Sequence, residues 1–537
     1  MKSNKTTSIL SFILLFFAGA SAQQPFEFTP DQKLRVAEAV IEKYYVEDVD
    51  SEELAAEAIR AMLKTLDPHS SYTTPEETLE FTQPLEGKFS GIGIQFNMLE
   101  DTVYVIQTTA GGPSERRGIL PGDRIVSAND TVIAGRKLKN SDIIKVLRGP
   151  KGSLVRLGVR RGGEAELIEF DIIRDDIPVY SVDESFMADP TTGYIRVTRF
   201  AEDTAKEVAD AMKKLRKQGM KNLIIDLSDN GGGYLGSAFQ LASEFLGRDV
   251  PVVSTSGKNV PAQTFTTESN GTFLDGRVVV IVNQYSASAS EILAGAMQDN
   301  DRGLIVGRRT FGKGLVQRPF PFPDGSMIRL TTSRYYTPSG RCIQKHYDKG
   351  HGEEYQLDML NRYSSGELWS ADSIQRPDSL RYATLRNGRT VYGGGGILPD
   401  VFVPADTSHY TPYYRDLMAK GIINRTCINY VDANRDELHK LYPNEDAFYA
   451  GFSMPSSLTD NLIARATEAG IEFNEEQWQR SRPTIEAIMK GLLCRDLYEN
   501  GSYFRALAPL SKDFNEALRL INDTGRYNRL LQTGDEG

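Results

Sequence analysis

One serine of the sequence, Ser288, lies where a nucleophile could be presented. It follows the apolar run Val278–Val282, which predicts a buried strand, and precedes a segment with the spacing of a helix. Its neighbours are small, in Tyr285-Ser286-Ala287-Ser288-Ala289-Ser290, so a substrate carbonyl could approach the backbone. A helix start also offers unpaired N–H groups and a positive dipole end, which suit an oxyanion intermediate. The alternative is a tight turn whose serine only caps the helix.

One lysine, Lys313, could supply the general base. It lies between two glycines in Thr310-Phe311-Gly312-Lys313-Gly314, after a predicted strand at 304–306. A lysine in such a turn is usually a solvated surface residue. Burial would disfavour its charged form and lower its pKa, and the neutral amine could then accept a proton. A serine–lysine pair needs no histidine, and none of the five histidines lies near the motif of a known triad.

The elements that must position these two residues alternate between strands and helices. The predicted elements are strands at 194–200, 223–227 and 278–282, a helix at 205–217, and a glycine turn, Asn230-Gly231-Gly232-Gly233, that leads into another helix. Such alternation indicates a layered α/β core. The stretch at about 341–391 is polar and irregular, and it is interpreted as an insertion in this core.

Other parts of the chain have a different texture. Apolar residues at helical spacing predict two helices before residue 67, the first of which begins at Thr29-Pro30. Between about Phe89 and Ile173, short alternating runs separated by glycine turns predict a compact β-rich module. After Pro404 the chain becomes helical again. With 537 residues, the chain is therefore expected to hold about three or four domains.

The composition argues against some kinds of partner. The formal net charge is −10, so the chain has no electrostatic attraction to phosphate backbones, and no nucleic-acid partner is expected. No His, Cys, Asp or Glu cluster has metal-ligand spacing and no phosphate-binding loop is present, so neither a metal nor an organic cofactor is expected. Of the three cysteines, Cys342, Cys427 and Cys494, the last two could form a bridge, the alternative being three structural thiols.

The first residues have the features of a secretory signal. Lys2 and Lys5 precede the apolar run Ile9–Ala18, which is too short to span a bilayer, and Ala20-Ser21-Ala22 fits a cleavage site. We therefore predict an exported, periplasmic protein whose signal peptide is removed after Ala22. The alternative is a retained membrane anchor.

The segments around the serine and the lysine together resemble the signature of the C-terminal processing, or tail-specific, peptidases. The matching residues are Asn283-Gln284-Tyr285-Ser286-Ala287-Ser288-Ala289-Ser290-Glu291-Ile292, Gly307, and Thr310-Phe311-Gly312-Lys313-Gly314-Leu315-Val316-Gln317. Lys313 follows Ser288 by 25 residues and Gln317 follows Lys313 by four, as in the family. The resemblance implies that Ser288 is the nucleophile, that Lys313 is its base, and that Gln317 orients the lysine.

The resemblance also implies an oxyanion hole. In the family it uses the N–H after the serine, here that of Ala289, and a glycine N–H from an N-P-G-G turn. In this chain Gly231 stands in place of the proline, so the turn is looser by sequence. The second donor is then Gly232, with its neighbour Gly233 as the alternative.

The β-rich module is similar to the family's PDZ domain. Gly91-Ile92-Gly93-Ile94 lies where the carboxylate-binding loop of such a domain would be, so Gly91, Ile92, Gly93 and Ile94 are predicted to bind the C-terminus of a substrate. The segment 66–72 also resembles a family segment; it is interpreted as structural, and His69 receives no catalytic role. The helices beyond Asp406 resemble the extension of Bacteroidetes-type members.

The predicted fold is therefore multidomain α+β. Its parts are a signal peptide (1–22), an N-terminal helical region (23–85), a PDZ domain (86–175), a layered α/β serine peptidase core of the crotonase/ClpP-like type (176–405) and a helical C-terminal domain (406–537). The C-terminal helices could serve packing, a homodimer, or an adaptor or activator protein.

The predicted activity is that of a serine endopeptidase with a Ser–Lys dyad. It would cleave exported polypeptides near their C-termini, after the PDZ domain has bound the free C-terminal tail. The alternative is a non-catalytic PDZ scaffold that only binds termini. The substitution at Gly231 favours the scaffold, and the intact Ser288, Lys313 and Gln317 oppose it.

Overall fold

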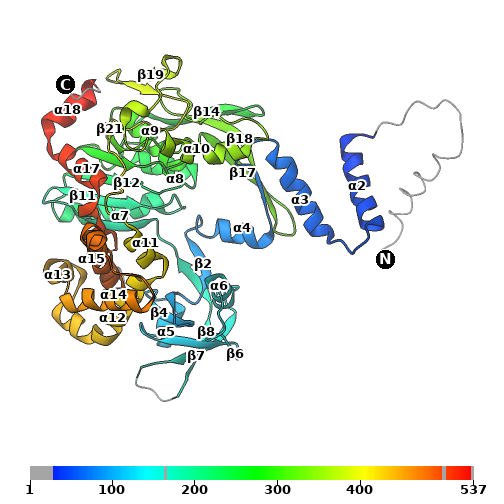
Figure 1. The fold of residues 1–537 in the computed structure, drawn as a ribbon. Coiled ribbons are helices and arrows are strands. Elements are labelled where there is room, and N and C mark those ends of the chain that lie inside the picture. Colours follow the sequence, from blue (N-terminus) through cyan, green and yellow to red (C-terminus); the bar gives the residue numbers. More distant parts are fainter. Residues whose placement is uncertain (1–27, 163–165, 499–502, 534–537) are drawn as a thin grey trace, which may run out of the picture. The chain divides into compact units, whose positions relative to one another are not determined.

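The computed structural model describes residues 28–162, 166–498 and 503–533 (Figure 1). The predicted signal peptide, residues 1–22, lies outside the described residues. The chain divides into two compact units, residues 1–63 and residues 64–537. No helix in the described ranges is long and apolar enough to cross a membrane.

The described part of the first unit is helical. Helix α2 (Pro30–Tyr44) begins as the sequence predicts, with Thr29 as N-cap and a proline at the first helical position. Helix α3 (Ser51–Lys64) has acidic residues in its first turn, which stabilise the N-terminal end of the helix dipole. The prediction of two helices in this region is confirmed.

The β-rich module forms one sheet packed against a helix. Its strands pair in the order β3-β4-β5-β7-β8, with β6 on β5. Their bounds are β3 (Ile94–Leu99), β4 (Thr102–Thr108), β5 (Arg124–Ala128), β6 (Thr131–Val132), β7 (Leu154–Arg160) and β8 (Ile168–Ile173). Helix α6 (Asn140–Leu147) buries Ile143 and Leu147 against the sheet, and the short helix α5 (Pro113–Arg117) follows β4. A ribbon of β2 (Lys88–Gly91) and β9 (Asp175–Pro178) flanks the module.

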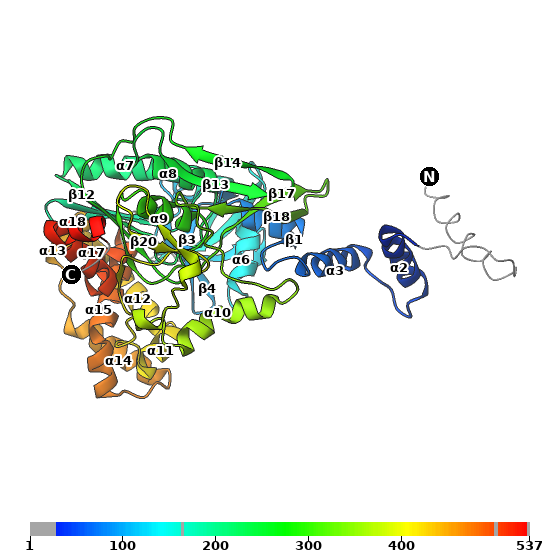
Figure 2. The same ribbon diagram turned by 90° about the horizontal axis from the view of Figure 1, so that it is seen from above.

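The core of the second unit is a largely parallel sheet (Figures 1 and 2). Its strands pair in the order β10-β11-β12-β15-β16-β21, and only the β10–β11 pair is antiparallel. The bounds are β10 (Val182–Met187), β11 (Thr192–Val197), β12 (Asn222–Asp226), β15 (Val278–Val282), β16 (Leu304–Gly307) and β21 (Val401–Phe402). Strand β15 is buried along its whole length, as its run of β-branched residues predicts.

Helices cover both faces of this sheet. On one face lie α7 (Thr204–Lys217), α8 (Leu235–Ser243) and α9 (Ala289–Asp299), which share one apolar cluster with the strands. On the other face lie α17 (Lys512–Asn522) and α18 (Thr524–Thr533), from the far end of the described chain. The C-terminal helices therefore complete the layered α/β core that the sequence predicts.

A second sheet carries the segment after the lysine. It pairs in the order β1-β18-β13-β14, with β17 on β18. The bounds are β1 (Ser71–Thr73), β13 (Pro251–Gly257), β14 (Val260–Thr266), β17 (Leu315–Pro321) and β18 (Met327–Tyr336); helix α4 (Pro75–Thr82) follows β1. Strand β17 begins directly after Gly314, so this sheet holds one end of the lysine turn.

The insertion is not irregular throughout, and that part of the prediction was wrong. It contains helix α10 (Gly352–Ser364), short 3-10 turns at 371–373 and 378–380, and a hairpin of β19 (Arg381–Ala383) and β20 (Thr390–Tyr392). The two buried residues of α10 are Tyr355 and Arg362, while Leu357 and Leu360 are exposed. A helix that buries polar side chains lacks the apolar stripe by which sequence periodicity reveals helices.

The C-terminal domain before α17 is helical, as predicted. Its helices are α11 (Pro412–Ala419), α12 (Ile422–Leu441), α13 (Glu445–Gly451), α14 (Ser456–Glu468), α15 (Glu475–Leu497) and α16 (Phe504–Leu507), around one apolar core. Cys427 and Cys494 are buried in that core and are not joined by a disulfide, so the bridge considered as an alternative is not formed.

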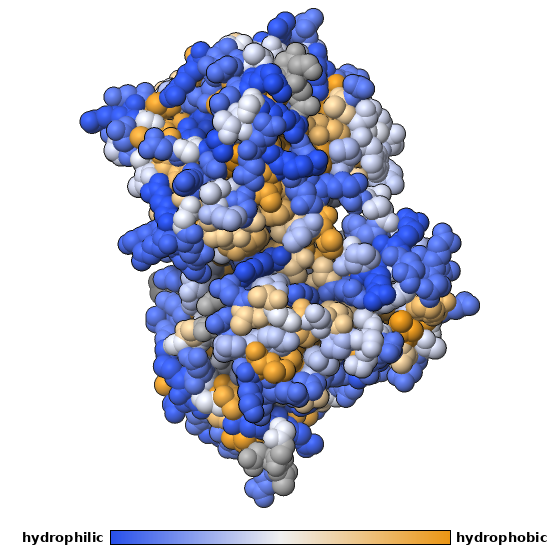
Figure 3. Space-filling view, turned by 90° about the vertical axis from the view of Figure 1, so that its left-hand side faces the viewer, coloured by the Kyte–Doolittle hydropathy of each residue, from blue (hydrophilic) through white to orange (hydrophobic). Residues whose placement is uncertain are grey.

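The PDZ-like module contacts helix α12. Ile428 packs with Leu99 and Ile106, and the hydroxyl of Tyr104 donates a hydrogen bond to Asp432 at 3.1 Å. The face drawn in Figure 3 is largely hydrophilic, with apolar side chains gathered around a hollow near its middle. The helical domain thus provides a surface against which the PDZ-like module rests.

Candidate active site

Ser288 lies at the N-cap of helix α9, directly after the turn that follows strand β15. Its φ of 56° and ψ of −112° are unusual for a residue with a side chain, and such strain is typical of functional turns. The two flanking serines have structural roles, because Ser286 donates to the carbonyl of Leu227 (2.7 Å) and Ser290 to that of Asn230 (2.9 Å). The middle serine is half-buried and is presented by a rigid turn.

A buried carboxylate, that of Glu291, joins the serine turn to the lysine turn. Its Oε2 accepts hydrogen bonds from the backbone N–H groups of Ser288 and Lys313, both at 2.8 Å. Its Oε1 accepts from the N–H of Gly312 at 2.7 Å and from the hydroxyl of Thr310 at 2.5 Å. Burial raises the pKa of Glu291, and these four donors act in the opposite direction. Sequence reasoning missed this role, although a glutamate three residues after a serine at a helix start fits a capping box.

The lysine turn, Thr310–Gly314, has a partner for every backbone N–H and C=O group. Such complete pairing is the rule for buried backbone and holds the turn in one conformation. From Thr310 to Gly314, the five N–H groups donate in order to the carbonyl of Ile397, the carbonyl of Ser286, the carboxylate of Glu291 (twice) and the side chain of Gln344. In the same order, the five carbonyls accept from the guanidinium of Arg362 (twice), the N–H of Lys345, the hydroxyl of Tyr335 and the N–H of Tyr335.

The side chain of Lys313 is half-buried, and its pKa is lowered from the ordinary 10.5 to about 8. The largest cause is burial, followed by the positive charge of Arg329. The negative charges of Glu291 and Asp67 act in the opposite direction. With a pKa near 8, about a tenth of the lysine is neutral at pH 7. The structure therefore gives this lysine the property that a general base needs.

Gln317 lies on strand β17 and is held by a chain of hydrogen bonds. Its Nε2 donates to the hydroxyl of Thr331 at 3.2 Å, and that hydroxyl donates to Asp67 at 3.0 Å. Asp67 in turn accepts from the N–H and the hydroxyl of Ser70. A direct contact between Gln317 and Lys313 stays a prediction. The segment 66–72, interpreted as structural from the sequence, supports the residue that is predicted to orient the base.

The glycine turn lies directly against the serine turn. A Cβ on Gly232 would be 2.8 Å from both the Ala287 carbonyl and the Cβ of Ser288, and 3.0 Å from the N of Ala289. Around Gly231, in contrast, no atom lies within 4 Å of such a Cβ. The absence of proline at Gly231 thus leaves space without disturbing the packing.

The backbone geometry distinguishes the two candidate oxyanion donors. The N–H of Gly232 already donates to the side-chain oxygen of Asn230 at 2.9 Å. Phe200 donates to the Gly232 carbonyl and accepts from the N–H of Tyr234, so the N–H of Gly233 points away from Phe200. This geometry favours Gly233 over Gly232 as the partner of the N–H of Ala289, which begins helix α9.

The predicted carboxylate-binding loop lies in the PDZ-like module, between strands β2 and β3. The carbonyls of Ile92 and Gly93 accept hydrogen bonds from the N–H groups of Ser114 and Thr109, both at 3.0 Å. Gly93 has a φ of 72°, which a glycine adopts without strain. The loop is therefore ordered at the head of strand β3, and its binding role stays a prediction.

His69, to which the sequence assigned no catalytic role, lies near the lysine. Burial lowers its pKa to about 4, and the positive charge of Lys313 is the second cause. Its Nε2 is 2.8 Å from the hydroxyl of Tyr355. Among the described residues, no group of three or more His, Cys, Asp or Glu side chains could hold a metal ion.

A layered α/β core that holds the turn of a strained serine and the turn of a half-buried lysine on one carboxylate fits a serine-type peptidase. Family models agree with this class of protein, and each matches a defined range of residues. Residues 191–351 match peptidase family S41, and residues 90–173 match the PDZ domain. Residues 18–78 match the activating protease CtpB N-terminal domain, and residues 413–499 match a family of unknown function, DUF8443.

Two relatives of known class indicate which kind of serine peptidase this is. The carboxy-terminal processing protease CtpB of Bacillus subtilis (strain 168) is 35% identical over 340 residues, which are 63% of this chain and 69% of the relative. The protease CtpA of the same strain is 33% identical over 346 residues, 63% of this chain and 73% of the relative. The chain belongs to peptidase family S41 and is a C-terminal processing serine protease with a PDZ domain.

Among solved structures, this chain is similar to the photosystem II D1 C-terminal processing protease. The two sequences are 29% identical over a match that covers 57% of this chain and 82% of that protein's chain, and the TM-score is 0.33.

Proposed function

We propose that the protein cleaves exported polypeptides near their C-terminal ends, with Ser288 as nucleophile and Lys313 as general base. The observation that carries this proposal is the carboxylate of Glu291, which binds the backbone N–H of both residues at 2.8 Å. Two turns that are separate in sequence are thereby held in one fixed relation, as a nucleophile and its base require.

The proposed reaction follows from these positions. The neutral amine of Lys313 accepts the proton of the Ser288 hydroxyl while the serine oxygen attacks the scissile carbonyl carbon. The resulting oxyanion is stabilised by the N–H of Ala289 and the N–H of Gly233. The lysine then protonates the leaving amine, and an acyl-enzyme remains. A water molecule, deprotonated by Lys313, hydrolyses this ester and releases the serine.

We further propose that the PDZ domain captures the free C-terminus of the substrate. Support comes from the ordered loop Gly91–Ile94 at the head of strand β3, because successive backbone N–H groups in such a loop can bind a carboxylate and the strand edge can pair with an extended tail. The C-terminal helices would then contribute a homodimer contact or an adaptor site in addition to packing.

Export to the periplasm is proposed from the sequence of residues 1–22 alone. The charged start, the short apolar run and the A-x-A site support it. N-terminal sequencing of the protein from a periplasmic fraction should begin at Gln23. A Bacteroidetes-type lineage is a further proposal, and it rests on the helical extension beyond Asp406.

The proposal is tested with an unstructured peptide that ends in an apolar residue. Wild type, Ser288→Ala and Lys313→Ala are compared on the free-acid peptide and on the same peptide with a C-terminal amide. We expect cleavage only by the wild type, and slower cleavage of the amide because its tail lacks the carboxylate. Normal cleavage by folded Lys313→Ala would refute the base assignment, and equal rates on both peptides would refute capture of the carboxylate.

A further inference from the structure

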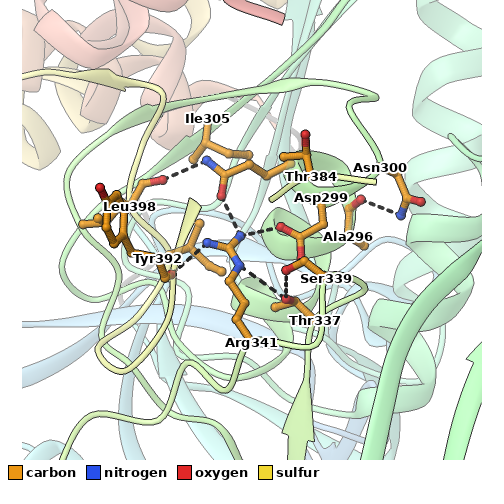
Figure 4. A network of polar contacts seen from close by, with 12 residues as sticks. Ala296, Asp299, Asn300, Ile305, Thr337, Ser339, Arg341, Thr384, Tyr392 and Leu398 are labelled. Atoms are coloured by element: carbon orange, nitrogen blue, oxygen red, sulfur yellow. Dashed lines mark hydrogen bonds and ion pairs between the residues drawn. The ribbon is translucent and has the colours of Figure 1, made fainter. Parts of the chain in front are cut away.

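Both ends of the insertion are anchored to the C-terminal end of helix α9 (Figure 4). Arg341, at the start of the insertion, is fully buried and pairs with Asp299 at 2.6 Å. It also donates to the side chain of Gln298 at 2.7 Å and to the carbonyl of Tyr392, at the end of the insertion, at 2.9 Å. Since α9 begins after Ser288, the helix that carries the nucleophile also fixes the base of the insertion.

From this base the insertion reaches the lysine turn through Arg362 of helix α10. The buried guanidinium donates to three successive carbonyls, those of Arg309 (3.3 Å), Thr310 (2.8 Å) and Phe311 (3.1 Å). A planar guanidinium presents several donors in a fixed arrangement, which suits several acceptors at once. Asp358, one helical turn earlier, lies 3.0 Å from its Nε and holds the side chain in place.

A second residue of α10, Tyr355, contacts His69 near the lysine side chain. The tyrosine hydroxyl lies 2.8 Å from Nε2 of His69, and the two rings meet edge to face at 5.1 Å. The ring of Tyr355 also packs against Phe311 of the lysine turn, and the Nζ of Lys345 lies 4.0 Å from both ring centroids. These aromatic groups thus pack directly beside the lysine turn.

We propose that helix α10 is the positioning element of the general base: Arg362 fixes the turn that carries Lys313, and Tyr355, bonded to His69, closes the pocket around the lysine side chain. This inference rests on the proposed function, because it takes Lys313 as the base. Neither Arg362 nor Tyr355 touches the reacting atoms, so both act through the lysine.

Charged and titratable groups face Lys313 from several elements. Arg329 on β18 lowers the pKa of the lysine, and Glu291 on α9 and Asp67 before β1 raise it. His69 is held neutral at pH 7 because its own pKa is about 4. Burial is the largest cause of the lowered lysine pKa, so water admitted by loss of the aromatic wall should raise that pKa.

The test measures the protonation of Lys313 without relying on cleavage. The full chain carries Ser288→Ala, and acetylation of Lys313 by limiting acetic anhydride is followed by mass spectrometry between pH ~6 and ~11, a range that spans ordinary and lowered lysine pKa values. The variants are Tyr355→Ala and Arg362→Met. The matched control is Tyr363→Ala, on the same helix but with an exposed tyrosine.

We expect Tyr355→Ala and Arg362→Met to move the acetylation midpoint upward by at least about one pH unit, while Tyr363→Ala leaves it unchanged. In chains with Ser288 intact, kcat/KM at pH 7 should fall about tenfold with little change in KM, since one pKa unit is a tenfold change in the neutral fraction. Tyr355→Phe, which keeps the ring, should lie between wild type and Tyr355→Ala.

An unchanged midpoint in folded Tyr355→Ala and Arg362→Met would overturn the inference. If Tyr355→Ala does not fold, Tyr355→Phe decides, because it removes only the hydroxyl that meets His69. The proposed function fails separately: a wild type that cuts no peptide, although the midpoints shift as expected, contradicts the peptidase proposal and still supports the role of α10 in setting the lysine pocket.

Discussion

The buried glutamate between the two turns gives a sharp prediction. In Glu291→Gln, one oxygen that accepts two hydrogen bonds becomes an NH2 group that faces donors. If the amide nitrogen takes the Oε2 position, it confronts the N–H groups of Ser288 and Lys313; if it takes the Oε1 position, it confronts Gly312 and Thr310. Either way two buried donors lose their acceptor. At about 1–3 kcal/mol for each unsatisfied group, the free energy of unfolding should fall by about 2–6 kcal/mol.

Activity should fall further than stability alone explains, because the turns of nucleophile and base lose their common anchor. We expect kcat/KM of folded Glu291→Gln to drop at least about a hundredfold, which corresponds to about 2.7 kcal/mol of lost transition-state stabilisation. The assays are urea unfolding followed by circular dichroism and peptide cleavage at a temperature where the variant is folded.

The matched control is Glu268→Gln, an exposed glutamate of the same core. Its unfolding and its kcat/KM should stay within about 0.5 kcal/mol and twofold of the wild type. If Glu291→Gln behaved like this control, the carboxylate would not be the anchor of the site, and the reasoning from its four hydrogen bonds would be refuted.

Three further predictions follow from the same geometry. Because the pKa of Lys313 is lowered, the unfolded chain binds a proton between about pH 8 and pH 10.5 that the folded chain does not, so the free energy of unfolding should rise with pH across that window. Lys313→Met removes the charge, and urea unfolding should show it to be more stable than the wild type at pH 7 by about 3 kcal/mol. No gain in stability would contradict the burial of the charge. Gly232→Ala should abolish cleavage, because its Cβ would meet backbone atoms of the serine turn, whereas Gly231→Ala should cleave at close to the wild-type rate; equal rates in a peptide assay would show that the turn adapts. Arg341→Met should leave the buried charge of Asp299 unpaired and lower the free energy of unfolding by about 3–5 kcal/mol, and a thermal midpoint equal to that of the wild type would contradict this.

The sequence predicts the parts of this molecule that depend on local patterns. Strand β15 is a continuous run of Val and Ile, and helix α2 has its capping threonine and proline, so the strand and the start of the helix could be placed to the residue. The serine and the lysine could be proposed because the segments around them, and the interval of 25 residues between them, resemble the signature of a known peptidase family. These features need no knowledge of which distant segments meet.

The parts that the sequence does not predict depend on contacts between distant segments. His69 and Tyr355 are separated by 286 positions, and no local sequence pattern around either residue predicts their contact. Helix α10 was missed because its buried side chains are polar. The choice between Gly232 and Gly233 turns on which way one N–H points, and adjacent glycines give no pattern that decides it.

The shared anchor at Asp299 has a consequence for how the chain can vary. Because Arg341 and Tyr392 are joined through one hydrogen-bonded cluster, the insertion behaves as a closed loop whose stem is fixed. The entropic cost of closing a flexible loop grows only with the logarithm of its length, so doubling the number of residues between the stems costs about 0.6 kcal/mol. Natural or engineered variants could therefore replace the insertion between these two residues by a longer or shorter one without disturbing the central sheet.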